Sequence, residues 1–337
     1  MGKIKLLDCT LRDGGYVNDW RFGEKAIAAI ASTLEKSGVD IIELGFIKTN
    51  PADPDRTVFN DIAMVNKLIK NKKSGQQYAV MAEVIDPLPL DQLKPATPEG
   101  PDIIRVIVWK RLLKEGYDYC KGIVEKGYKL CVQPARVSQY SDDEFVEMIK
   151  LFNTLNPMAV YVVDSWGTMY KDKLLNYLKL ADANLKPNIA VGYHGHNNMM
   201  QAFDVACAFC EQNLDRDLII DASVYGIGRG AGNLNTELFA KWANEKLGKS
   251  YDVGAIVEIY DKYVQHIYKL TPWGFSLPYL ITAKYNANPN FAGFYAHKGL
   301  SCTEIDRCIS SIPPEKRIIF KPETAQEAIL EVSHDKL

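Results

Sequence analysis

Two short motifs, far apart in the chain, carry residues that can bind a metal ion. Arg12 and Asp13 stand in the stretch DCTLRDGG at 8–15, and His194 and His196 are separated by one glycine. On an extended strand the two histidines point to the same face. One carboxylate and two neutral imidazoles can hold a divalent cation and leave positions open for a substrate. We therefore expect Asp13, His194 and His196 to be metal ligands, although the histidines alone could simply be hydrogen-bonding residues at a strand end.

Other polar residues are placed to act beside such a metal. Mixed nitrogen and oxygen ligation suits Mn²⁺, Co²⁺, Zn²⁺ or Mg²⁺, and the spacing does not choose among them. Arg12 stays cationic and can stabilise an enolate oxygen, or form a salt bridge to Glu43, and both roles are compatible. Ser165, with the backbone of Gly167, can hold a substrate carboxylate, or it can be an ordinary turn serine.

Three further features could belong to the site, but for each of them a purely structural role is at least as well supported as a functional one. Asn197 and Asn198 follow the second histidine and are expected to orient the loop. Asn233 lies in a glycine-rich turn at 230–237, where it could bind the metal, but helix capping or phosphate binding by the turn is as plausible. The CxxC pair at 207–210 falls in an apolar helical run without a second pair, which indicates buried cysteines rather than a zinc or redox site.

These residues follow short β-rich segments that alternate with amphipathic helical stretches. Eight segments are predicted as strands, and several are continuously apolar, as expected for strands covered on both faces. They are 4–9, 40–46, 78–84, 102–109, 129–134, 159–164, 189–194 and 218–224. Eight strand–helix repeats predict a (β/α)8 TIM barrel, with a doubly wound open sheet as the alternative. In a barrel the polar residues at the strand ends would meet at one mouth.

Helical periodicity fills the gaps between the strands. One apolar stripe runs from Ala26 to Leu34, with Gly38 placed to end the helix, and another runs through Val58, Ile62, Val65 and Ile69. A third, from Phe145 to Phe152, is preceded by a capping signal at 141–144.

The pattern changes after the eighth strand. Segment 252–270 reads as a helix, and the remainder is aromatic and then polar. We therefore predict a barrel domain at 1–248 and a smaller, mostly helical domain at 249–337. The net charge of −2 gives no reason to expect nucleic acid. No signal peptide or apolar run of membrane-spanning length is visible, and with seven cysteines this favours a cytoplasmic protein of reduced thiols.

Taken together, these motifs resemble the DRE-TIM metallolyases, a superfamily of metal-dependent barrel lyases and synthases. It includes hydroxymethylglutaryl-CoA lyase and isopropylmalate synthase, and the nearest resemblance is to 4-hydroxy-2-oxovalerate aldolase. The resemblance rests on TLRDG at 10–14, IELGF at 42–46, Asp164-Ser165, GYHGHN at 192–197 and GAGN at 230–233, with FAGFY at 291–295 similar to the tail motif of the aldolase.

This resemblance implies a function and roles for the site residues. The implied reaction is cleavage of a 4-hydroxy-2-oxo acid to pyruvate and an aldehyde, or the reverse condensation, through a metal-stabilised enolate. Arg12 would stabilise the enolate with Glu43 holding it, Ser165 would seat the pyruvate carboxylate, and Tyr295 would line the pocket. Mn²⁺ is the first metal to expect, with an aldehyde dehydrogenase as a possible partner and a homo-oligomeric assembly.

The chain departs from the family at one position. The aldolases place a histidine base three residues after the metal aspartate, and here that residue is Tyr16. A tyrosine of ordinary pKa, about 10, is a poor base near neutrality. A metal-bound water, Tyr16 with a lowered pKa, or His297 could replace it. The synthases have Glu-Gln where this chain has Gly15-Tyr16, so the alternatives are an acyl-CoA–dependent Claisen-type transferase and a catalytically silent, metal-binding partner subunit.

Overall fold

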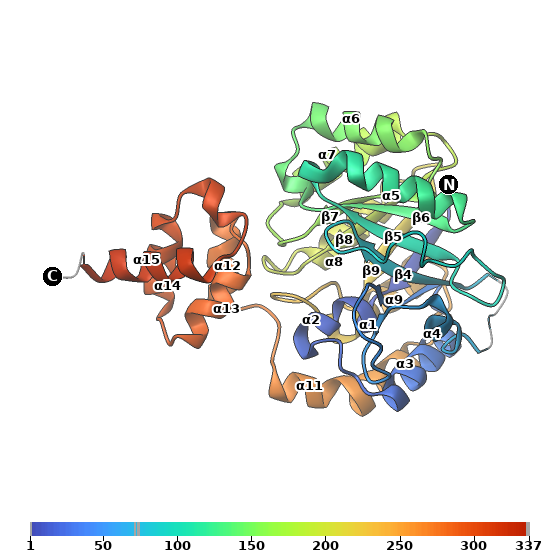
Figure 1. Cartoon of the computed structure of the whole chain (residues 1–337), viewed down its shortest axis with the longest axis horizontal. Helices are drawn as coiled ribbons and strands as arrows, with labels where there is room; N and C mark the ends of the chain where they lie inside the picture. The colour runs from blue at the N-terminus through green and yellow to red at the C-terminus, as the bar shows by residue number, and fades with distance from the viewer. Residues whose placement is uncertain (1, 71, 73–74, 335–337) are drawn as a thin grey trace.

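The computed structural model describes residues 2–70, 72 and 75–334, and it contains a closed barrel of parallel strands (Figure 1). Around the barrel the strands are ordered β1, β9, β8, β7, β6, β5, β4 and β2, and β1 pairs with both β9 and β2. Their bounds are β1 Ile4–Asp8, β2 Ile41–Ile47, β4 Gln77–Glu83, β5 Ile103–Val108, β6 Lys129–Pro134, β7 Ala159–Asp164, β8 Ala190–Gly195 and β9 Leu218–Ala222. The predicted TIM barrel is confirmed.

Helices pack around the barrel as the periodicity predicted. They are α3 Glu24–Ser37, α5 Leu113–Glu125, α6 Asp142–Asn153, α7 Lys171–Asn184, α8 Ala202–Cys210 and α9 Thr236–Leu247. Helix α3 ends at Gly38 in the left-handed conformation, with φ of 82°, which a glycine adopts without a steric penalty. Helix α6 begins with a capping box between Ser141 and Glu144. Short helical turns complete the barrel loops: α1 Thr10–Asp13, α2 Gly15–Asn18, η1 Lys110–Leu112, η2 Val137–Gln139 and η3 Val224–Gly226.

The barrel differs from eight regular repeats between β2 and β5. The stripe that begins at Val58 is not one helix: β3 (Val58–Phe59) pairs with β2, and only α4 (Ile62–Asn66) is helical. Asp61 caps α4 by accepting from the N–H of Ala63. Residues 84–102 connect β4 to β5 in turns and extended segments without a helix, so one strand of the barrel lacks its crossover helix.

Segment 252–270, which was expected to begin the second domain, packs instead with the barrel. It is broken into α10 (Val253–Ile259), a π-helical turn η4 (Tyr260–Val264) and α11 (Gln265–Leu270). Ile256, Ile259 and Trp273 are part of the same hydrophobic core as the barrel strands. We therefore propose that the boundary lies near residue 275 rather than after residue 248.

The remaining helices form a second, smaller core beside the barrel. They are α12 Leu277–Lys284, α13 Asn290–His297, α14 Cys302–Ser311 and α15 Pro322–His334, with the short turn η5 Pro314–Arg317. Figure 1 shows this unit (orange to red) joined to the barrel by the connection that follows α11. Its core is built around Phe291, Tyr295 and Ile309. Contacts to the barrel include the guanidinium of Arg229, which donates to the side-chain oxygens of Asn288 and Asn290.

Two expectations about the rest of the chain can be compared directly with the structure. Cys207 and Cys210 of α8 are buried and unpaired, and burial raises the pKa of the Cys207 thiol to about 12. These residues are therefore packing residues, as expected. Among the described helices, none combines the length and apolarity needed to cross a bilayer.

Candidate active site

A cavity opens at the carboxyl ends of the barrel strands, where TIM-barrel active sites lie. Its lining comes from most of the strand ends and from the loop after β9. The lining residues are Arg12, Asp13, Tyr16, Met81, Glu83, Ile107, Trp109, Gln133, Ala135, Arg136, Val163, Ser165, Trp166, His194, His196 and Arg229. Six of the residues predicted from the sequence for this site therefore share one cavity: Arg12, Asp13, Tyr16, Ser165, His194 and His196.

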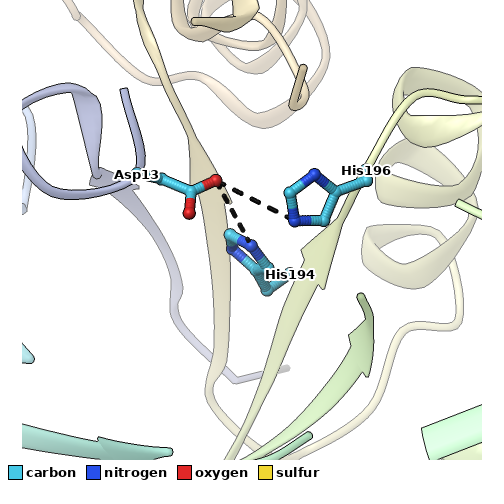
Figure 2. A group of neighbouring side chains, drawn as sticks. All are labelled: Asp13, His194 and His196. Carbon is cyan, nitrogen blue, oxygen red and sulfur yellow. Dashed lines mark ion pairs between the residues drawn. The ribbon is translucent and has the colours of Figure 1, made fainter. Parts of the chain in front are cut away.

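The three predicted metal ligands converge within this cavity. Figure 2 shows the carboxylate of Asp13, from the turn after β1, facing the imidazoles of His194 and His196 at the end of β8. The Nε2 atoms of His194 and His196 lie 3.8 and 3.9 Å from the same Asp13 oxygen, Oδ2. All three side chains are buried, and their ligand atoms lie within 4.8 Å of one another. This spacing is suited to one cation shared by the three groups.

Each histidine is oriented by a partner on its other ring nitrogen. Nδ1 of His194 lies 3.0 Å from the carboxylate of Asp221, and Nδ1 of His196 lies 3.1 Å from the backbone oxygen of Arg229. Both partners accept hydrogen bonds, so both Nε2 atoms are left with a lone pair toward Asp13. Such outer partners are typical of metal-binding histidines. Burial lowers the pKa of His196 to about 4, which keeps that imidazole neutral, as a metal ligand must be.

The carboxylate of Asp13 is also prepared for a cation. Burial opposes its ionisation, but Arg12, the two histidines and the hydrogen bond from Asn233 together outweigh burial and hold the pKa of Asp13 below its ordinary value. Asn233 donates to Oδ2 of Asp13 over 2.6 Å, while its own Oδ1 is buried and has no hydrogen-bond partner in the described part of the chain. A buried orphan acceptor next to a carboxylate and two imidazoles fits a divalent cation, and it makes Asn233 a further candidate ligand.

Arg12 is held by two carboxylates. Its Nη1 contacts Oδ1 of Asp13 at 2.5 Å, and its Nε contacts Oε2 of Glu43 at 2.7 Å. The predicted salt bridge to Glu43 is therefore present. Because both contacts are buried, the guanidinium is fixed beside the metal position, with Nη2 not engaged by either carboxylate.

Two buried residues that were not predicted from the sequence connect this arrangement. Arg105 on β5 pairs with Glu43 at 2.9 Å and with Asp221 on β9, and Asp221 in turn accepts from His194. A continuous chain of charges thus runs from Asp13 through Arg12, Glu43, Arg105 and Asp221 to His194. The available signal was one charged residue inside each of two otherwise apolar strands, DIIRVIVW and LIIDASV.

Ser165 and Tyr16 also line the cavity, and each has a hydroxyl group that can exchange a proton or a hydrogen bond with a ligand. Ser165 Oγ accepts from the backbone N–H of Arg136 at 2.9 Å, so its own hydroxyl proton is free to donate toward the cavity. The ring of Tyr16 packs edge-on against Trp20. Although its side chain is partly exposed, burial of the hydroxyl and the nearby charge of Asp13 raise the pKa of Tyr16 to about 12. The pKa of Tyr16 is therefore raised, and the lowered pKa considered for it is not found.

Two residues of the C-terminal domain that were considered for the site lie outside the cavity. Tyr295 was expected to line it, but it is fully buried in the core of the helical domain and donates to the backbone oxygen of Ala325 at 3.2 Å. The structure therefore corrects that assignment: on α13, Tyr295 and Phe291 are four residues apart and both face the core of their own domain. His297 is exposed on a separate hollow with Gly230 and Phe294, so it does not replace the base.

Loss of one imidazole should weaken metal binding sharply. We expect His194→Ala to lower the affinity for Mn²⁺ by at least about 10²-fold. Replacing a residue that only hydrogen-bonds to a metal ligand already costs about 10- to 100-fold. Electron paramagnetic resonance of free Mn²⁺ during titration measures this. His266→Ala, on the exposed side of α11, is the control and should bind as the parent does. Equal Mn²⁺ affinity in His194→Ala would remove His194 from the ligand set.

Comparisons with known proteins agree with this geometry. Residues 110–262 match the family described as HMGL-like. The chain is 24% identical over 253 residues to 4-hydroxy-2-oxovalerate aldolase of Bacillus cereus, covering 74% of this chain and 72% of that one. It is 28% identical over 264 residues to the enzyme of that name from Carboxydothermus hydrogenoformans, covering 77% and 74%.

The fold is also found among solved structures. The N-terminal domain of a putative aldolase from Bacteroides vulgatus superposes with a TM-score of 0.72 at 22% identity, covering 87% of this chain and 96% of that domain. The matched family region includes β6 to β9 and therefore both histidines. The match of residues 110–262 to the HMGL-like family agrees with the resemblance drawn from the motifs at the strand ends.

Proposed function

We propose that this chain is a divalent-metal-dependent aldolase that cleaves or forms a 4-hydroxy-2-oxo acid, with pyruvate and an aldehyde on the other side of the reaction. The convergence of Asp13, His194 and His196 beside the guanidinium of Arg12 in one cavity carries this proposal. The aldolase-named relatives, at 24–28% identity, support it. Mn²⁺ is the proposed metal, and Mg²⁺, Co²⁺ or Zn²⁺ would suit the same donors.

The metal would supply Lewis acidity at the ketone of the bound 2-oxo acid. The other contributions come from the chain itself. Arg12 is cationic and held by Asp13 and Glu43, and it would donate from Nη2 to the oxygen that becomes negative in the enolate. The hydroxyl of Ser165 would donate to the carboxylate of the acid.

Tyr16 is proposed to handle the proton on the 4-oxygen of the substrate. With a pKa raised to about 12, its phenol is protonated at neutral pH, so it can donate to the aldehyde oxygen as the new carbon–carbon bond forms. In the cleavage direction the same residue would have to accept that proton. Because the phenolate fraction is small at neutral pH, we expect cleavage to become faster as the pH is raised.

Tyr16→Phe tests that role. We expect condensation of pyruvate with an aldehyde to slow by about 10²-fold, the lower end of general acid–base contributions. Exchange of the pyruvate methyl protons should be much less affected, because enolisation does not involve the aldehyde oxygen. Both rates can be followed by proton NMR on the same samples. Equal losses of exchange and condensation would place Tyr16 at the enolisation step instead.

The direct test of the proposed function is metal-dependent exchange of the pyruvate methyl protons for deuterium, followed by NMR in D₂O. This measurement does not require the aldehyde to be known. We expect exchange that depends on added Mn²⁺ and is absent in Asp13→Asn. A chain that binds Mn²⁺ but does not exchange pyruvate protons would overturn the proposal.

A further inference from the structure

Arg136 is a buried cation in the cavity that the proposed chemistry does not use. It follows β6, and its guanidinium carbon lies 4.6 Å from the ring centre of Trp109 and 4.5 Å from that of Trp166. The two indoles come from the ends of β5 and β7, so they flank Arg136 on its two sides. Only 7% of Arg136 is exposed. Its position is therefore built by three neighbouring strand ends rather than by a flexible surface loop.

This guanidinium lacks an acceptor. Across the described residues, no carboxylate lies within 4.0 Å of the guanidinium and its side-chain N–H groups make no hydrogen bond, whereas the backbone N–H of Arg136 donates to Ser165. Stacking on indoles covers the faces of a guanidinium, but its five N–H donors lie in the plane and still require acceptors. Because Arg136 lines the cavity, these donors are available to an anionic ligand that enters it.

The surroundings of Arg136 add positive charge. Burial, and then the charges of Arg229 and Arg111, lower its pKa to about 10, so it is still a cation at neutral pH. The carboxylate in this part of the cavity, Glu83, accepts from Nε1 of Trp109 at 3.1 Å and lies 3.5 Å from Lys48. Glu83 thus fixes the indole instead of neutralising Arg136.

The backbone of Arg136 is also held in a form that non-glycine residues seldom adopt. Its φ and ψ are both 58°, in the left-handed region, and its N–H is fixed by the hydroxyl of Ser165. Such conformations persist where the surrounding structure enforces them, and they gather at ligand sites. The guanidinium is therefore presented in place before any ligand arrives.

The position of β6 in the barrel indicates which part of a substrate would meet Arg136. In the closed order of eight strands, β6 is four strands from β1 in either direction, so it lies across the mouth from the turn that carries Asp13. In the proposed function the 2-oxo acid end of the substrate would be held by the metal, Arg12 and Ser165, which leaves the guanidinium of Arg136 for a second acidic group. On a 4-hydroxy-2-oxo acid, a second acidic group at the far end belongs to the half released as the aldehyde.

We propose that Arg136 binds an anionic group, a carboxylate or a phosphate, on the aldehyde half of the substrate. This inference rests on the proposed aldolase function and extends it to a substrate class: 4-hydroxy-2-oxo acids with a second acidic group at the far end. The indoles of Trp109 and Trp166 hold the cation, and its in-plane donors form the paired hydrogen bonds that guanidinium groups make with carboxylates and phosphates.

The test compares acidic and neutral aldehydes in condensation with pyruvate by the Mn²⁺-loaded protein. Succinic semialdehyde and glyceraldehyde 3-phosphate are the acidic partners, and butanal and glyceraldehyde are their neutral counterparts. We expect kcat/KM to favour one acidic partner over its counterpart by about 10- to 100-fold, the size of a charge-assisted hydrogen-bonded pair. The favoured partner distinguishes a carboxylate from a phosphate.

Variants at Arg136 test whether the preference for acidic aldehydes depends on this residue. Arg136→Gln should abolish it through KM, and Arg136→Lys should restore part of it by returning the charge. Arg111→Gln is the matched control, because Arg111 also stacks on Trp109, at 5.5 Å, but does not line the cavity. An undiminished preference in Arg136→Gln, or no preference in the parent, would overturn the inference. So would an equal loss of pyruvate proton exchange, which would place Arg136 on the pyruvate carboxylate.

A binding measurement separates failure of this inference from failure of the proposed function. Succinate and glycerol 3-phosphate, with butanediol and glycerol as neutral controls, can be titrated by calorimetry without any reaction. If pyruvate exchange is absent but one anion binds and Arg136→Gln loses that binding, the anion site stands and the aldolase proposal falls. If neither anion binds in an Arg136-dependent way, the anion site is refuted.

Discussion

Arg12→Lys is expected to lower metal-dependent proton exchange at the pyruvate methyl by about 10²- to 10³-fold, the loss seen when one donor to a developing oxyanion is removed. Lysine keeps the positive charge but has a single ammonium group at the end of a flexible stem. It cannot contact Asp13 and Glu43 together, as Nη1 and Nε of Arg12 do, and still present a third nitrogen to the substrate.

The measurement is the initial exchange rate at saturating Mn²⁺, with the bound metal determined in parallel. Metal content should remain close to that of the parent, because Asp13, His194 and His196 are unchanged. Arg21→Lys is the matched control, since Arg21 forms an exposed ion pair with Asp53 on the same segment of chain. An exchange rate in Arg12→Lys within tenfold of the parent would show that charge alone suffices and that donor geometry does not matter.

The sequence predicted the barrel and the metal site because both depend on local pattern plus one rule of topology. Each strand could be recognised as an apolar run, and parallel barrel strands bring their carboxyl ends to one mouth. Asp13 and the two histidines follow the first and seventh of these strands, so their meeting did not require any knowledge of distances. The resemblance to DRE-TIM metallolyases depended on the same residues.

The sequence predictions that differ from the structure depended on packing that no local pattern shows. The stripe at Val58 has helical spacing, yet its first two residues form strand β3, which pairs in parallel with the end of β2. Tyr295 was assigned from a short motif, but which face of α13 meets the cavity depends on packing between helices of a second domain. Arg136 carried no signal in sequence, since its meaning comes from two tryptophans 27 and 30 residues away on neighbouring strand ends.

The charged interior of the barrel was also beyond sequence reasoning, although it accounts for how the site is held. Arg105 and Asp221 lie on strands separated by more than a hundred residues, and each looks like an isolated charge in an apolar run. Once paired, they join Glu43, which holds Arg12, to His194, which faces the metal position. The guanidinium of Arg105 therefore supports both sides of the metal site: the side that carries Arg12 and the side that carries His194.

Arg105→Met is therefore expected to destabilise the fold by about 3–5 kcal/mol, the range for removing one partner from a buried ion pair. The Arg105 side chain is completely buried and contacts both Glu43 and Asp221. Methionine fills much of its volume but leaves the buried carboxylate of Asp221 without a cation and that of Glu43 with Arg12 alone. The thermal midpoint of the metal-free protein should fall by roughly 10 °C for a barrel of this size.

The loss should also reach the metal site, because Asp221 would no longer be held in place to accept from Nδ1 of His194. We expect Mn²⁺ affinity to fall by about 10- to 100-fold, as for other changes behind a metal ligand. Arg56→Met provides the comparison, since Arg56 pairs at 2.7 Å with Asp19, whose side chain is 72% exposed, and such pairs contribute about 0–1 kcal/mol. If Arg105→Met melts within about 2 °C of Arg56→Met, the buried carboxylates must be neutralised by protonation instead, and the stability of the variant should then decline as the pH is raised.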